Sequence, residues 1–418
     1  MTTTAPSSNV RRHHVRQMGG RDPHEENRIA TPLELLFDLT FATCFSFAAS
    51  QFAAELAEAR YAAALLGFGF ASITICWAWG SFSWFSSAYD TDDWLFRLAT
   101  MVQMIGVLVL AIGLPPMFAS IARGQHLDNS VMVLGYVIMR VALLSQWLRA
   151  AKQDSARRRA CLTYAITISI AQIGWVALIL ARWSTGGALI LGAILVLVEF
   201  AGPVLAERKD GGTPWNADHI VERHSLFAII ALGEGVVGTV TALSAVVEQQ
   251  GWTPDAALVG IAGTGLTFAM WWMYYMVPAA EVLERRRDRA FVWGYGQVLI
   301  VTAIVATGAG LHVAAYFIEH KSVIGPLATV LSVAAPVAVY IGLIYTTYYY
   351  LVRRYSRLDA WLLIAIAVVL VASIVAAQSG IDVAKCLLIL ILAPAIIVVG
   401  YERRGYRYEA ETVARERA

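Results

Sequence analysis

Four ionisable side chains lie inside long apolar stretches of this sequence, and they are the residues best placed to do chemistry. They are Asp38, Arg140, Glu199 and Glu234. At a helical rise of about 1.5 Å per residue, they lie roughly 9 to 18 Å from the corresponding ends of their stretches. Three carboxylates cannot all pair with one guanidinium. A bound proton or metal cation is therefore expected to balance the charge.

The four side chains are predicted to lie at similar depths in the membrane, and lipid disfavours an unpaired guanidinium. Arg140 should therefore contact at least one of Asp38, Glu199 and Glu234. Each residue has a structural interpretation as well. Arg140 could simply hold helices together, Asp38 could form an ion pair with it, and Glu199 could extend its side chain to the membrane surface. The sequence leaves these alternatives open.

Glu234 has the pattern that most favours a functional role. About two apolar helical turns separate it from the charged segment around Glu222 and Arg223. At that depth its side chain cannot reach the membrane surface. Gly233 and Gly235 flank it and allow another backbone to approach closely. We predict that Glu234 is the proton or cation site. The structural alternative is a protonated acid that is hydrogen-bonded where two helices meet.

Glu34 is the fourth candidate acid. In Thr31-Pro-Leu-Glu34 it completes a capping box with proline at the first helical position, which predicts the start of a helix. Asp38 lies one turn further along the same face. Capping explains Glu34 at least as well as a role in ion or proton binding.

Matching spacings indicate an internal repeat. Trp77 precedes Gln103 by 26 residues, and Trp271 precedes Gln297 by 26 residues. One carboxylate precedes each tryptophan, Asp38 in the first case and Glu234 in the second. Gln103 and Gln297 could line a path through the protein or hydrogen-bond to neighbouring helices. The spacing predicts two parallel six-helix repeats.

Composition explains where these residues lie. The chain is 58% hydrophobic and 15% charged, whereas about a quarter of the residues in soluble domains are charged. Its apolar residues form blocks of about 20, the length of a helix that crosses a bilayer. The sequence therefore predicts an all-α polytopic integral membrane protein with about twelve spans, near 33–54, 62–87, 96–120, 130–149, 160–181, 186–206, 221–246, 256–279, 293–317, 325–351, 360–377 and 383–401.

Basic residues predict the orientation. Of the 32 Lys and Arg residues, 26 fall in segments on one side of these spans and 5 on the other, and basic residues accumulate in the cytoplasm. Both termini are therefore predicted to lie on the cytoplasmic side of a cytoplasmic (inner) membrane. The predicted organisation is a disordered tail (1–30), a first half (31–206), a linker (207–220), a second half (221–401) and a second tail (402–418).

The segment from Thr31 to Phe41, Thr-Pro-Leu-Glu-Leu-Leu-Phe-Asp-Leu-Thr-Phe, resembles the opening helix of the bacterial low temperature requirement A family. Three further pieces follow in the family's order: Trp77-Ala-Trp79 running to Tyr89–Asp93 and Arg97, Glu222-Arg223-His224 with Leu232-Gly233-Glu234, and Trp271-Trp272-Met-Tyr274. The family usually has Gly after the third motif's Arg, where this chain has His224. The resemblance implies a polytopic bacterial membrane protein.

Residue chemistry favours a secondary transporter or channel for a small ion or solute, proton-coupled through the buried carboxylates. A membrane-embedded lipid-modifying enzyme and a sensor or structural partner of other membrane proteins stay open. No Walker A, HExxH, GxSxG or CxxCH pattern occurs, so we predict no enzyme activity, catalytic residue, metal site or cofactor. The expected partners are the bilayer and the transported species, not nucleic acid. A homo-oligomer is left open.

Overall fold

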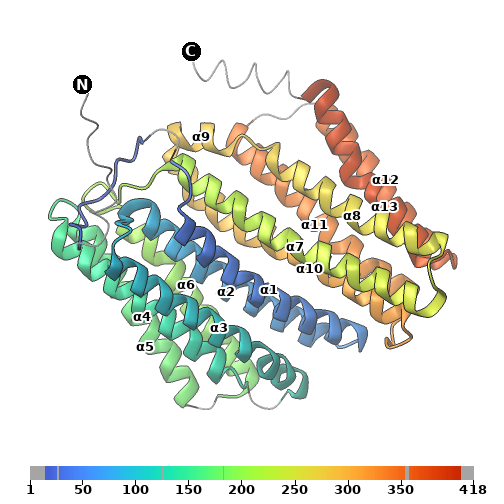
Figure 1. Cartoon of the computed structure of the whole chain (residues 1–418), viewed down its shortest axis with the longest axis horizontal. Helices are drawn as coiled ribbons and strands as arrows, with labels where there is room; N and C mark the ends of the chain where they lie inside the picture. Colours follow the sequence, from blue (N-terminus) through green and yellow to red (C-terminus); the bar gives the residue numbers. More distant parts are fainter. Residues whose placement is uncertain (1–14, 26–27, 125–126, 182, 354–356, 406–418) are drawn as a thin grey trace, which may run out of the picture. The chain divides into compact units, whose positions relative to one another are not determined.

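The computed structural model describes residues 15–25, 28–124, 127–181, 183–353 and 357–405. Twelve helices in this part of the chain are long and apolar enough to cross a membrane, which confirms the predicted all-α polytopic architecture. They are α1 (Pro32–Ala57), α2 (Tyr61–Tyr89), α3 (Trp94–Arg123), α4 (Ser130–Gln153), α5 (Arg158–Leu180), α6 (Thr185–Ala206), α7 (Ala217–Gln250), α8 (Pro254–Tyr275), α10 (Ala290–Ile318), α11 (Pro326–Val352), α12 (Arg357–Gln378) and α13 (Val383–Gly400) (Figure 1).

The helix boundaries differ from the sequence prediction by up to four residues, and two of these differences bear on the site. The span predicted over 256–279 ends at Tyr275, before Pro278, and is followed by the short helix α9 (Ala279–Arg285) and a 3₁₀ turn at Arg287–Arg289. Proline cannot donate a backbone hydrogen bond, so the helix ends before it. Helix α7 begins at Ala217, four residues earlier than expected.

Apolar side chains cover the exposed faces of the helices. On α12, residues spaced alternately three and four apart are 52 to 69% exposed: Trp361, Ile364, Val368, Val371 and Val375. A soluble helix would carry polar residues on such a face. These exposed apolar faces are suited to lipid.

The chain divides into two compact units. Unit 1 comprises Met1–Cys44 and Trp77–Glu222, and unit 2 comprises Phe45–Cys76 and Arg223–Ala418. Within unit 1, α3 packs on α4, α4 on α5, and α5 on α6. Within unit 2, α10 packs on α11, α11 on α12, α12 on α13, and α13 on α8.

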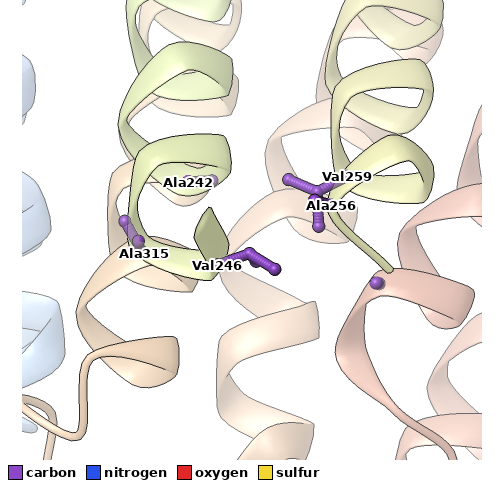
Figure 2. Close-up of a cluster of buried hydrophobic side chains, with 7 residues drawn as sticks. Ala242, Val246, Ala256, Val259 and Ala315 are labelled. Carbon is purple, nitrogen blue, oxygen red and sulfur yellow. The ribbon is translucent and has the colours of Figure 1, made fainter. Parts of the chain in front are cut away.

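Small residues hold the helices of unit 2 close together. Ala242 and Val246 of α7, Ala256 and Val259 of α8, and Ala315 of α10 form part of a buried apolar cluster (Figure 2). Further along α7, Thr239 lies against Gly263 of α8. Close helix packing through small side chains is typical of membrane proteins.

Gly308 of α10 lies directly against the α7 backbone at the candidate acid. A Cβ atom at Gly308 would lie 2.6 Å from the carbonyl carbon of Glu234 and 2.8 Å from the nitrogen of Gly235. Backbone atoms cannot rotate away, so the two helices would have to separate. The α7–α10 crossing therefore requires glycine here.

Gly308→Ala should consequently lower stability by about 1 to 3 kcal/mol, the usual range for overpacking. The measurement is the midpoint of thermal unfolding in detergent. Gly294→Ala on the same helix is the control, because a Cβ there meets no atom within 4 Å. Equal midpoints for the two variants would show that the crossing is looser than described.

The segment before α1 differs from the expected disordered tail. In unit 1, the Arg16 N–H donates to Asp93 Oδ2 (2.9 Å), and the Met18 N–H donates to Gln153 Oε1 (2.7 Å). Arg28 Nη2 donates to the carbonyl oxygen of Ser86 (2.9 Å). Specific polar partners thus order residues 15–25 and 28–30 without any apolar pattern. Residues 1–14, 26–27 and 406–418 lie outside the described residues.

Candidate functional site

A cluster of hydrogen-bond donors surrounds the Glu199 carboxylate in the interior of unit 1. Three groups donate to Glu199 Oε2: Trp77 Nε1 (2.6 Å), the Tyr136 hydroxyl (2.7 Å) and Arg140 Nη2 (2.8 Å). Two more donate to Oε1: Gln172 Nε2 (3.1 Å) and Trp175 Nε1 (3.3 Å). We call these six residues the Glu199 cluster. It joins α2, α4, α5 and α6 through one buried carboxylate.

Helical spacing positions the donors. Tyr136 and Arg140 are four residues apart on α4, and Gln172 and Trp175 are three apart on α5, so each pair shares a helix face. The predicted contact of Arg140 with one of the three carboxylates is confirmed. Glu199 is only 4% exposed, so the alternative that it extends to the membrane surface is wrong. Its five hydrogen bonds hold it inside.

Sequence reasoning singled out Arg140 and Glu199 but missed four donors, namely Trp77, Tyr136, Gln172 and Trp175. The sequence identifies Trp77 as a repeat marker and as part of a family motif, but not as a hydrogen-bond donor to a buried acid. The polar pairs on α4 and α5 could have indicated these donors. Two polar side chains one helical turn apart inside an apolar span need a hydrogen-bond partner on another helix.

Asp38 lies fully buried in α1 and accepts a hydrogen bond from Trp79 Nε1 (2.7 Å). The alternative that it pairs with Arg140 is not observed, because the guanidinium bonds to Glu199. Asp38 and Glu199 thus each receive an indole N–H from α2.

The capping box predicted for Thr31 and Glu34 is confirmed. Glu34 Oε2 accepts the Thr31 N–H (2.8 Å), and the Glu34 N–H donates to Thr31 Oγ1 (3.3 Å). The same carboxylate lies 3.3 Å from His219 Nε2, and both side chains are fully buried. Glu34 therefore combines a capping role with a second polar contact inside unit 1.

Asp90, in the loop between α2 and α3, is linked electrostatically to Glu34. Burial raises the pKa of Asp90 from 3.8 to about 6, and the negative charge of Glu34 adds to this effect. Arg21, whose Nη1 lies 3.6 Å from the Asp90 carboxylate, opposes it. Asp90 thus changes charge near neutral pH at the point where the N-terminal segment contacts unit 1.

This raised pKa makes stability depend on pH. Because the folded chain holds the Asp90 proton up to pH about 6 and the unfolded chain releases it near 3.8, stability should rise as pH falls from 7 toward 4, by at most about 3 kcal/mol. Asp90→Asn should be more stable than wild type at pH 7 and less sensitive to pH. Thermal unfolding midpoints between pH 4 and 7 measure this.

Asp92→Asn is the control for that comparison. It removes a partly exposed carboxylate in the same loop as Asp90, one that pairs with Arg97 of α3. If Asp90→Asn retains the full pH dependence of the wild type, another group is responsible.

Glu234, in unit 2, has very different surroundings. It is 4% exposed, and its Oε1 accepts one hydrogen bond, from the Ser46 hydroxyl (2.5 Å). Its Oε2 has no hydrogen-bond partner among the described residues. Glu234 also forms no ion pair with any residue that the structure describes. Gly235 lies against Thr267 of α8, and Gly308 lies against the backbone of Glu234 and Gly235, so a second backbone does approach closely, although Gly233 faces open space.

The two repeat glutamines hydrogen-bond to neighbouring helices. Gln103 Nε2 donates to Gln146 Oε1 (3.0 Å), and the Tyr274 hydroxyl donates to Gln297 Oε1 (2.9 Å). Both glutamines are buried. These contacts fit the structural alternative, while a role in lining a path stays a prediction.

Comparisons with known proteins agree with the motif pattern. A family model described as "Bacterial low temperature requirement A protein (LtrA)" matches residues 29–394. The chain is also similar to an uncharacterized protein of Rhizobium meliloti (strain 1021), with 27% identity over 300 residues, 66% of this chain and 67% of the relative. No solved structure matches.

Proposed function

The chain belongs to the bacterial low temperature requirement A family, and we propose that it is a secondary transporter or channel for a small ion or solute, coupled to protons or a cation through Glu234. Twelve candidate spans make it a multi-pass membrane protein. The 26-to-5 distribution of basic residues supports cytoplasmic termini in the inner membrane.

The single hydrogen bond to Glu234 carries this proposal. A buried carboxylate that is ionised needs a nearby cation or several donors, and Glu234 has one neutral donor and an unpaired oxygen. It must therefore hold a proton, a cation or a water molecule in the folded protein. An acid that exchanges these occupants is the usual means of coupling in membrane transporters.

Glu199 provides the contrast within the same chain. Its five donors include a guanidinium, so its charge is already balanced. Arg140 is therefore not available to neutralise the other acids. Unlike Glu199, Glu234 has described partners that leave room for an exchangeable cation or proton.

Local structure around Glu234 supports movement. Gly238 of α7 faces Gly308 of α10, and Gly308 meets the Glu234 backbone, so the two backbones approach each other with few interlocking side chains. Helices that contact each other through small residues can slide with little steric cost. A shift of α7 against α10 would change the surroundings of Glu234.

Reconstitution into liposomes tests the proposal. Purified protein should move an ion or solute without ATP, and the rate should depend on the pH gradient. A pH-sensitive dye inside the vesicles and a panel of alkali cations, anions and amines identify the species. Failure of every species to cross faster than in protein-free vesicles would overturn the proposal.

A further inference from the structure

We propose that the Glu199 cluster is a binding site for guanidinium and ammonium head groups, and that the Arg140 side chain is its resident occupant. The site lies in unit 1 and does not depend on Glu234. Its binding chemistry is separate from the transport activity proposed above.

The surroundings of Glu199 have the chemistry that recognises organic cations. A carboxylate supplies the opposite charge, and the aromatic side chains of Trp77, Tyr136 and Trp175 all reach it. Aromatic faces attract cations, most strongly where water is excluded. The Arg140 guanidinium demonstrates this, since its Cζ lies 5.6 Å from the centre of the Tyr136 ring.

The resident cation is incompletely satisfied. Nη2 of Arg140 bonds to Glu199, but Nε and Nη1 have no partner among the described residues. Gln172 donates to the same carboxylate, yet its Oε1 has no partner there either. Arg140 is 3% exposed and Gln172 is 7% exposed, so water does not compensate freely.

These unpaired atoms indicate that the site can accept a free cation. Leaving buried donors unsatisfied weakens the hold on Arg140. A mobile cation can choose its own orientation, donate to both Glu199 and Gln172 Oε1, and stack on the aromatic rings without the constraint of a tether to α4. Guanidinium and alkylammonium ions meet these requirements, whereas anions and neutral ureas do not.

Removing the tethered occupant tests the site directly. In detergent, Arg140→Ala should unfold at a lower temperature than wild type, and millimolar methylguanidinium chloride should restore more than half of the loss with a saturating dose response. Urea, which has the same shape without the charge, and sodium chloride should not. The double variant Arg140→Ala/Glu199→Gln should show no recovery.

Competition with Arg140 supplies a second test. The wild type should bind methylguanidinium with a midpoint at least about tenfold higher, because the tethered guanidinium must first leave. Equal midpoints in wild type and Arg140→Ala would place the ligand elsewhere and overturn the proposal. So would the absence of recovery, or equal recovery in the double variant.

Wild-type fluorescence keeps the proposal testable if Arg140→Ala does not fold. A titration with methylguanidinium should change the tryptophan emission of the wild type in a saturable way. The change should be reduced in Trp175→Phe and largely lost in Trp77→Phe/Trp175→Phe, since both rings border the site. A change that is identical in Trp175→Phe, or no change in the wild type, contradicts the assignment.

Discussion

Glu234→Gln should abolish pH-dependent flux in liposomes while leaving folding and membrane insertion intact. Glutamine has nearly the same shape, and its Oε1 can still accept the Ser46 hydrogen bond. It cannot release a proton or bind a cation as a carboxylate does. The expected rate is therefore that of protein-free vesicles, with an unfolding midpoint close to that of wild type.

Two variants separate coupling from structure. Glu234→Leu removes the hydrogen bond and the charge together, so a purely structural acid would lose stability in this variant and in Glu234→Gln. Glu199→Gln is the matched control, because it alters an equally buried carboxylate in unit 1. It should reduce stability but keep the pH dependence of flux. Transport with unaltered pH dependence in Glu234→Gln would remove Glu234 from the mechanism and leave Asp38 as the candidate.

The membrane architecture could be predicted because it depends on one-dimensional information. The length of an apolar block fixes whether a helix can cross the bilayer, and all twelve predicted spans correspond to helices. Proline was harder to interpret. Pro278 ends α8, yet α3 continues through Pro115 and Pro116, since neighbouring helices can accommodate a kink.

The partners of the buried charges could be predicted only in part. Depth along a helix follows from the sequence, and it correctly indicated that Arg140 meets a carboxylate. Which carboxylate depends on the helix face and on which helices are neighbours, and these follow from tertiary packing. For the same reason, the order of the N-terminal segment was not predictable: its partners, such as Asp93 and Gln153, are distant in sequence.

The internal repeat stays a prediction, and the contacts of the tryptophans in the two halves differ. In the first half, Trp77 of the second helix donates to Glu199 of the sixth. In the second half, Trp272 of α8 donates to Glu402, just beyond the end of α13 (3.2 Å). The first contact is buried and the second is exposed. The repeat spacing matches Trp77 to Trp271 and not to Trp272, so these two contacts are not a duplicated pairing.

Breaking the Arg140–Glu199 pair should have the largest effect on stability. Removing one partner of a buried ion pair leaves an uncompensated charge, which typically costs about 3 to 5 kcal/mol. The two single variants should differ in severity. Arg140→Met leaves Glu199 with four neutral donors, whereas Glu199→Gln leaves the guanidinium with one neutral acceptor and the Tyr136 ring. Glu199→Gln should therefore unfold at the lower temperature or denaturant concentration.

The double variant Arg140→Met/Glu199→Gln completes the cycle. It buries no net charge, so its loss of stability should be smaller than the sum of the two single losses by about 0.5 to 3 kcal/mol, the range for residues in one network. Chemical unfolding of all four proteins in the same detergent gives these differences. Additive losses would mean that the two charges do not interact in the folded protein. A smaller loss of stability in Glu199→Gln than in Arg140→Met would mean that the guanidinium has better partners than its unpaired Nε and Nη1 indicate.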